Sequence, residues 1–483
     1  MSKFSIYLEE IIRRSGEPIS RIAKNAGLER TSIHKALKDE RILSYSALKK
    51  LTQYFQLTIS ESRELNLYYD ILLQGEEVYS THSEICQLLF DLKHLHFSAF
   101  QYNPQSLADI KFSSKIVRGK SETEYAIQTI LHRETEISGS VINLYSGNNN
   151  PLAETLIKLW RSGRDFTVNQ IVSFRQNTTT KNHNQQNIHL IRNLLPVSLL
   201  SGSRYFAFYC FINDEIQESL NPFPYFIVTT NFMISINIDF SIAYINTDSS
   251  LIRFYHKQFE QTKAECQPLI SYSNEPLDVL SSYMNNTDKS GYFTIMTQPC
   301  MGRYYTRNII EKYIRQELPY RRELIEMGVR RFSVLAEQTN NYYTVFTEEG
   351  IKQFIADGII ADLPSAQVLP LEPSDRLILL KQLREDIAAD HVNGYIANED
   401  QFAIPQYLTF TCDPHFGLHV YAINDFVGGS YTCNLHISAV NIGKVFCDFI
   451  HFLPNTKYMY SKDQTLSILD SHIFSLESKL SAL

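Results

Sequence analysis

The chain has 483 residues, of which 44% are hydrophobic and 20% charged, and its formal net charge is −7. This length suits about two to four ordinary domains, and the composition excludes a disordered, collagen-like or low-complexity chain. The sequence contains no apolar run of the roughly 18 residues that a membrane-spanning helix needs, so we expect no membrane partner.

The charge is distributed unevenly along the chain. Residues 1–50 contain 11 Lys and Arg against 6 Asp and Glu, a net of +5, and the remaining residues carry a net of −12. A basic head on an acidic body suggests that one segment binds a polyanion and the other does not. The alternative is a solvated helical domain whose charge has no ligand.

The cysteines give no sign of a disulfide framework. Seven are present in a long chain, and none forms a Cys-x-x-Cys motif. An odd number of dispersed thiols is typical of a reducing compartment. Glu9 and Glu10 interrupt the apolar residues before a signal-peptide core could form, so we expect a cytoplasmic protein.

The first 75 residues are predicted to be a compact all-α domain of five short helices. Breaks occur at residues 15–18, at Gly27, at residues 41–44 and at residues 58–60, and a fifth helix is expected at about 61–73. Apolar side chains recur between these breaks at helical spacing. They are Phe4, Leu8, Ile11, Ile12, Ile22, Ala23, Ala26, Ile33, Ala36, Leu37, Leu48, Leu51 and Phe55.

From about residue 78 the pattern becomes mixed α/β. Alternation is clearest over residues 232–245, which predicts a single strand with residues 224–230 as its hairpin partner. Residues 175–187 are predicted to form a polar surface loop. Further strands are expected at 141–145, 166–174, 205–212, 291–297, 406–412, 417–423 and 430–438. Helices are expected at 80–96, 123–135, 152–162, 250–265, 305–316, 320–336, 347–357, 373–388, 440–452 and 463–481.

Residues 268–276, which include Pro276, are the best candidate linker within the body. The predicted fold is therefore multidomain α+β, with an all-α N-terminal domain followed by a two-lobed mixed α/β body. The predicted domains are residues 1–75, 78–268 and 275–483. Both lobes contain a strand, a loop and then a helix, but no residue-level repeat is visible, so a duplication stays an open alternative.

The most specific motif lies at residues 18–38. Two helices that cross closely need a small residue at their contact, and Ala23 fits that position. The short turn between them needs a residue that tolerates positive φ, which predicts the left-handed conformation for Gly27. Ile33 would then be buried on the inner face of the second helix.

This pattern resembles the helix-turn-helix of bacterial repressors, and the surrounding helices resemble the Cro/C1-type (XRE-type) domain over residues 4–73. Residues 44–48 and 60–65 continue much as that family does. The sequence departs from the family at Ile19, where phage repressors often have Gln, and at Glu29, where Ser or Thr is usual. It also departs at Leu37 and Asp39, where many members have Glu and Gly.

The resemblance implies DNA binding through a recognition helix at about residues 30–38. Arg30 would read guanine, and Thr31 would contact a thymine methyl or a phosphate. His34 and Lys35 lie one turn further on. Lys24, Lys38 and Arg41 are placed for backbone phosphates, which position the protein without specifying sequence. Pairing of two such heads is the usual route to affinity, so we expect a homodimer held by the body and a palindromic operator.

Two other clusters of side chains could form binding sites. Cys412, His415, His419, Cys433 and His436 could be metal ligands, but the strand pattern puts them on different faces and predicts core cysteines with surface histidines. Seven arginines fall in residues 303–331, which could bind an anionic effector or DNA phosphates. Interleaved glutamates favour salt-bridged helices instead.

No catalytic, metal or cofactor motif was found, so the sequence predicts a non-enzymatic transcriptional regulator that requires no cofactor. Its body would sense an unknown small-molecule or peptide effector, or mediate assembly. The alternatives are an enzyme that carries a DNA-targeting head and a protein-interaction module whose helix-turn-helix contacts protein. The operator sequence and the direction of regulation are left open.

Overall fold

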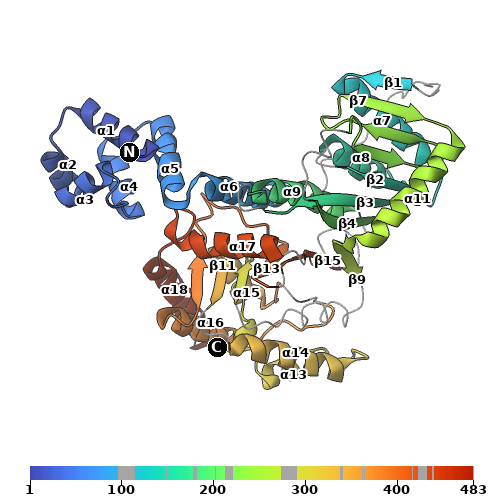
Figure 1. Cartoon of the computed structure of the whole chain (residues 1–483). Coiled ribbons are helices and arrows are strands. Elements are labelled where there is room, and N and C mark those ends of the chain that lie inside the picture. Colours follow the sequence, from blue (N-terminus) through green and yellow to red (C-terminus); the bar gives the residue numbers. More distant parts are fainter. Residues whose placement is uncertain are drawn as a thin grey trace.

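The computed structural model describes residues 1–95, 115–146, 150–177, 182–201, 203–212, 221–273, 291–337, 341–361, 363, 365–415, 417–422, 432–437 and 440–481. These residues form a multidomain α+β fold (Figure 1). A group of N-terminal helices leads through one long helix to two mixed sheets with their own helices.

The N-terminal helices, here called the head (residues 1–75), have a core of their own. Ser44 caps one helix by accepting from the N–H of Ala47, and Thr58 forms a capping box with Glu61 at the start of another. The helices are α1 (Lys3–Ser15), α2 (Ile19–Ala26), α3 (Arg30–Leu37), α4 (Tyr45–Tyr54) and α5 (Ile59–Gln74). Their core contains the residues that helical spacing predicted, including Phe4, Leu8, Ile11, Ile22, Ala23, Ile33, Ala36, Leu48 and Leu51.

Helix α6 (Glu76–Lys93) connects the head to both sheets. Its Glu84 carboxylate accepts from Arg192 at 3.1 Å and pairs with His189 at 2.7 Å, both on the neighbouring helix of the first sheet. On the other side, the Tyr407 hydroxyl donates to the Leu92 carbonyl. The helix begins four residues before the predicted start at 80, directly after Gly75.

The first sheet is built from residues 115–268, here called the first repeat. Its strands and helices are β1 (Lys115–Arg118), α7 (Lys120–Glu134), β2 (Ser140–Tyr145), α8 (Asn150–Arg161), β3 (Phe166–Arg175), α9 (Asn184–Leu200), β4 (Tyr205–Ile212), β5 (Tyr225–Val228), β6 (Met233–Ile236), β7 (Ile242–Asn246), α11 (Ser249–Glu265) and β8 (Gln267–Pro268). The strand order is β1-β7-β6-β5-β2-β3-β4-β8, in which β2, β3 and β4 are parallel and the other pairs are antiparallel.

The second sheet is built from residues 270–481, here called the second repeat. Its strands and helices are β9 (Ile270–Ser273), β10 (Tyr292–Ile295), the 3₁₀ helix η1 (Gly302–Tyr304), α13 (Arg307–Tyr313), α14 (Arg321–Ala336), β11 (Tyr342–Phe346), α15 (Glu348–Asp357), α16 (Pro373–Ala388), β12 (Asn393–Ile396), β13 (Leu408–Asp413), β14 (Gly417–Ala422), β15 (Thr432–Ile437), α17 (Val440–Phe452), η3 (Leu453–Asn455) and α18 (Lys462–Ser481). The strand order is β12-β11-β10-β13-β14-β15-β9.

The two sheets share one topology. In each, three parallel strands run outward in chain order, and the next three strands continue from the first of them as antiparallel neighbours. The strand that opens each repeat, β1 or β9, closes the far edge. In the first sheet, β8 pairs with the outermost parallel strand, β4. At the corresponding edge of the second sheet, a single bridge joins Ala397, which follows β12, to Met459. The two lobes therefore have the same strand order, which agrees with the duplication that the sequence left as an open alternative.

The prediction of a single strand over residues 232–245 is wrong, because these residues form two strands of a hairpin. Strands β6 and β7 flank a turn in which the Asp239 carboxylate accepts from both Asn237 and Ser241. Phe240 has φ 58° in this turn, and its side chain is buried. The polar residues of this turn alternate with apolar residues in the sequence, so the turn has the same period-two pattern as a strand. The predicted pairing with the preceding strand is confirmed by β5 and β6.

The structure also differs from the predicted linker at residues 268–276 and from the predicted polar loop at residues 175–187. Pro268 pairs with β4 in the first sheet, and Ile270–Ser273 join the second, so the second sheet starts before the predicted boundary at 275. Helix α9 occupies residues predicted as loop from Asn184 onward. The polar Asn187 is buried there because its carboxamide bonds both the N–H and the carbonyl of Arg175.

Candidate nucleic-acid interface

Helices α2 and α3 are joined by a tight turn at residues 27–29. Gly27 has φ 63° and ψ 45°, which confirms the predicted left-handed conformation, and its N–H donates to the carbonyls of Ala23 and Lys24. The N–H of Leu28 donates to the Ala23 carbonyl at 2.8 Å. Lys50 on α4 contacts the Gly27 carbonyl at 3.4 Å. The turn therefore ends α2 within one residue and fixes where α3 begins.

Helix α3 buries one face and exposes the other. Ile33 and Ala36 are buried in the head core, as predicted. The residues predicted to bind DNA lie away from that core, six of them exposed and His34 half-buried: Lys24, Arg30, Thr31, His34, Lys35, Lys38 and Arg41. Arg30 donates through Nε to Nε2 of His34 at 3.2 Å, so these two side chains lie together one turn apart on the helix.

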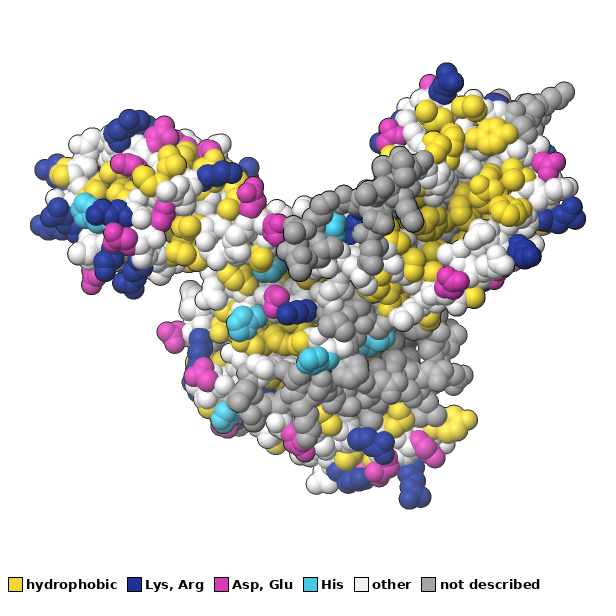
Figure 2. All heavy atoms as spheres, in the orientation of Figure 1, with side chains coloured by type: hydrophobic (Ala, Val, Ile, Leu, Met, Phe, Trp, Pro, Cys, Tyr) yellow, Lys and Arg dark blue, Asp and Glu magenta, His cyan; other side chains and the backbone are white. Residues whose placement is uncertain are grey.

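The cations of this face have no ion-pair partner among the residues that the structure describes. Within the described residues, no salt bridge involves Lys24, Arg30, Lys35, Lys38 or Arg41, whereas Arg14 on α1 is paired with Glu61 at 2.6 Å. Figure 2 shows dark blue Lys and Arg side chains spread over the head. Unpaired exposed cations can release counterions from DNA phosphates, which supplies most of non-specific affinity. The face has the charge that a phosphate backbone requires.

The first turn of α3 has no side-chain cap. Glu29 stands at the N-cap with φ −76° and ψ 130°, and its carboxylate makes no capping hydrogen bond. Ser or Thr would cap this helix better than Glu, and the missing cap leaves the first N–H groups of the helix for other acceptors. The positive end of the helix dipole lies at the same place as Arg30. A phosphate or a base acceptor would meet both.

Asp39 has a structural role that the sequence did not reveal. It follows α3 with φ 58°, a left-handed conformation that Asp adopts more readily than most residues other than Gly. Its carboxylate accepts from the Ser2 hydroxyl at 2.7 Å, the Ser2 N–H at 2.6 Å and the Ser5 hydroxyl at 3.2 Å. Burial alone would raise the pKa of Asp39, but the hydrogen bonds from Ser2 and Ser5 outweigh it and lower the pKa. Asp39 thereby ties the end of α3 to the start of α1.

The cysteine and histidine cluster is divided between two faces of the second sheet. Cys412 is buried beside the Phe293 carbonyl, among residues that pack against α17. His419 lies on the other face, stacked on His436 with ring centroids 3.9 Å apart. The prediction of a surface position is wrong for His419, which is buried with the rings of His436 and Tyr421 stacked beside it. Among the described residues, no group of His, Cys, Asp and Glu could hold a metal ion.

The arginines of residues 303–331 are mostly paired or buried. Arg307 contacts Glu326 at 2.8 Å and Glu311 at 3.3 Å, and Arg315 lies 3.6 Å from Glu317. These pairs confirm the salt-bridge interpretation for both arginines. Arg331 is instead buried, with its guanidinium 5.4 Å from the ring centroid of Tyr292.

None of the described helices combines the length and apolar character needed to span a bilayer. No protein-family model matches the chain, and no curated protein matches it. Two solved structures show a weak similarity to this chain. TrmBL2, an archaeal chromatin protein described with a novel mode of DNA binding, is 10% identical with a TM-score of 0.22, covering 46% of this chain and 70% of that one. A polyphosphate kinase from Porphyromonas gingivalis is 7% identical with a TM-score of 0.22, covering 79% of this chain and 59% of that one. Scores this low support no inference about fold or function.

Proposed function

We propose that this chain is a sequence-specific DNA-binding transcriptional regulator whose head binds double-stranded DNA. The observation that carries the proposal is the outer face of α3, where exposed cations follow a tight turn and have no ion-pair partner in the described part of the chain. The resemblance of residues 4–73 to the Cro/C1-type domain supports the same function. The body would sense an effector or hold an assembly together.

In this proposal α3 enters the major groove with its N-terminal end on the base edges. Arg30 donates to guanine and is held in place by its hydrogen bond to His34. Thr31 contacts a thymine methyl or a phosphate, and Lys35 reaches the next base step. Lys24, Lys38 and Arg41 bind phosphates on either side.

The regulator would act as a homodimer held by the body, on a palindromic operator. One helix-turn-helix covers only a short half-site, and two heads about 34 Å apart would read two half-sites on one face of the DNA. Of the 58 Phe and Tyr residues, only five lie in residues 1–60, so the body has far more aromatic side chains to offer an interface.

The test is a selection of bound sequences from random duplex DNA with the full chain, followed by light scattering with and without the selected duplex. We expect an enriched motif with two inverted half-sites, affinity that falls steeply with salt, and a dimeric mass. Binding without any enriched motif would leave a non-specific DNA-binding protein. Absence of salt-dependent binding would instead favour the interaction module, and a monomeric mass would remove the dimer.

A further inference from the structure

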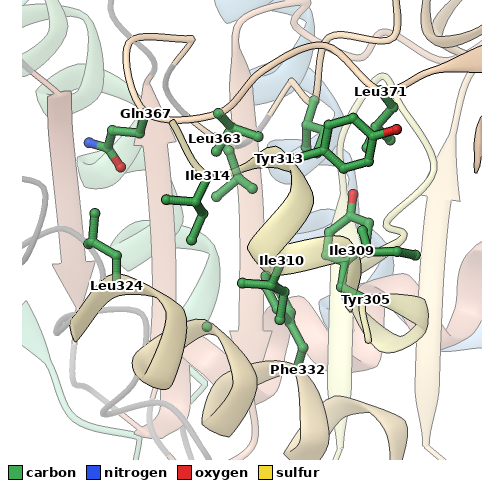
Figure 3. A pocket seen from close by; sticks show the side chains of 13 residues that line it. Tyr305, Ile309, Ile310, Tyr313, Ile314, Leu324, Phe332, Leu363, Gln367 and Leu371 are labelled. Carbon is green, nitrogen blue, oxygen red and sulfur yellow. The ribbon is translucent and has the colours of Figure 1, made fainter. Parts of the chain in front are cut away.

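The second repeat contains an apolar cavity of about 60 Å³ between α13, α14 and the segment that follows α15 (Figure 3). The described residues that line it are Tyr305, Ile309, Ile310, Tyr313, Ile314, Leu324, Gly328, Phe332, Ile360, Leu363, Gln367, Val368 and Leu371. A cavity needs about 10–15 Å³ to hold one water molecule, so this cavity has room for a group of a few heavy atoms. Cavities with such a lining stay dry and accept apolar molecules.

Among the residues that the structure describes, no charged side chain lines the cavity. Lys312 is paired with Glu372 at 2.6 Å and with Asp375 at 2.8 Å. The Tyr313 hydroxyl also donates to Asp375. The polar side-chain groups of the lining are the Gln367 carboxamide and the hydroxyls of Tyr305 and Tyr313, each of which can donate and accept a hydrogen bond. An ionic ligand would lose its hydration without gaining a counter-charge, whereas a neutral one would lose little.

The cavity lies where the second repeat departs from the first. The first repeat has one helix, α8, between its first two parallel strands and one helix, α9, between the next two. The second repeat has η1, α13 and α14 in the first of these connections, and α15, an extended segment and α16 in the second. Since the first repeat closes the same sheet without these additions, the sheet topology does not require them.

The two additions are joined to each other beside the cavity. Ile314 and Val368 form a β-bridge, the Arg315 N–H donates to the Gln367 carbonyl at 3.0 Å, and the Leu369 N–H donates to the Tyr313 carbonyl at 2.8 Å. The walls of the cavity therefore come from both insertions and are fixed to one another by backbone hydrogen bonds.

Gly328 keeps part of this space open. It lies within α14, where glycine is less favourable than alanine. A Cβ at this position would lie 3.5 Å from Cγ2 of Ile310 and 3.8 Å from Cε2 of Phe332, both of which line the cavity. Alanine would fit without strain, and a longer side chain would extend into the cavity.

We propose that this cavity is a binding site for a small, uncharged, mainly apolar molecule of about five heavy atoms, such as a short branched alcohol, with Gln367 as its hydrogen-bond partner. The proposal does not depend on DNA binding by the head. Ligands of this size bind in the millimolar to micromolar range at best, so direct binding has to be measured at high ligand concentration.

The experiment uses the full chain with isobutanol as the neutral probe and isobutyrate as its charged counterpart, followed by ligand-observed NMR and by melting temperature. We expect saturable binding of isobutanol that raises the melting temperature, and binding of isobutyrate at least tenfold weaker. Gly328→Leu should weaken isobutanol binding at least tenfold, and Ser333→Leu, which adds the same bulk on the exposed face of α14, should leave it unchanged. Gly328→Ala should bind more tightly than Gly328→Leu.

Three results would overturn the proposal: no saturable binding of isobutanol, equal binding of isobutyrate, or wild-type binding by a folded Gly328→Leu variant. If Gly328→Leu does not fold, Ile309→Phe fills the cavity from α13 and is subject to the same expectation.

Discussion

Two regions of this chain concentrate positive charge, and they use it in opposite ways. On the head, the cations around α3 have no ion-pair partner among the described residues. In the second repeat, Arg303 lies 3.2 Å from Asp386, and Arg307 binds Glu326 through two hydrogen bonds. Acidic residues occur in the head as well, but Asp39 is occupied by Ser2 and Ser5. A basic segment is therefore a better candidate for DNA binding when its neighbouring carboxylates are already occupied elsewhere.

The largest expected effect comes from removing the unpaired cations. Arg30→Ala combined with Lys35→Ala should reduce affinity for the selected operator by about 30-fold or more, since each good base contact contributes about 1–3 kcal/mol. The fold should be unaffected because both side chains are exposed. Fluorescence anisotropy at several salt concentrations measures the effect.

The matched control is Arg322→Ala combined with Arg330→Ala, which removes the same charge from exposed positions on α14. This variant should bind the operator like the wild type. If both double variants lose affinity equally, overall charge rather than the face of α3 determines binding.

Local features of the head could be predicted from sequence, because they depend on residues a few positions apart. The burial of Ile22 and Ile33 follows from helical spacing, and the conformation of Gly27 follows from the need to end a helix sharply. The clamp by Asp39 could not be predicted, because it joins residues 37 positions apart. The position after α3 was nonetheless the available signal, since many family members have Gly there.

The body was harder to predict because its organisation depends on distant strand pairs. Strands β11 and β12 were not predicted, although they complete the parallel part of the second sheet. The common topology of the repeats was hidden because α13, α14 and α15 lengthen the connections in the second one. His419 looked like a surface residue because alternation along a strand shows which side chains lie on the same face of the sheet. It does not show what covers that face.

The turn that presents α3 offers the second prediction. Gly27→Val should destabilise the head by about 1–3 kcal/mol, since a β-branched residue is strained at φ 63°. No atom lies within 4 Å of a Cβ at this position, so the cost comes from the backbone alone. Gly27→Asn, which tolerates this conformation, should recover most of the loss. Hydrogen exchange of the head amides measures both variants, and equal protection in all three proteins would contradict the assigned turn.

The third prediction concerns the junction between head and body. Asp70 on α5 is half-buried beside a small cavity that Gln74, His82 and Tyr458 also line. Burial raises the pKa of Asp70 to about 6, although Lys457 opposes the shift. A carboxyl group whose pKa is raised on folding favours the folded state fully below about pH 4, and this contribution is lost as the pH rises through about 6.

Asp70→Asn keeps a neutral side chain at every pH and should remove this dependence. At pH 7.5 the variant should protect the amides of α5 and α6 by about 1–2 kcal/mol more than the wild type, a figure reduced for partial exposure, and at pH 4 the two should agree. Burial lowers the pKa of His82 to about 4, so its charge changes little between pH 5 and 7.5. An identical pH profile in variant and wild type would show that Asp70 titrates normally.

The smallest effect is expected where the positive charge is already paired. Arg307→Ala removes the hydrogen bonds to Glu326, but both side chains are about half exposed, at 47% and 53%, and water replaces most of what is lost. We therefore expect no resolvable change in melting temperature and less than about a twofold change in operator affinity. Glu326→Ala leaves Arg307 without this partner and tests the converse. If removing Glu326 strengthens DNA binding, the two positive regions differ only in whether carboxylates neutralise their cations. If it does not, the position of α3 matters as much as its charge.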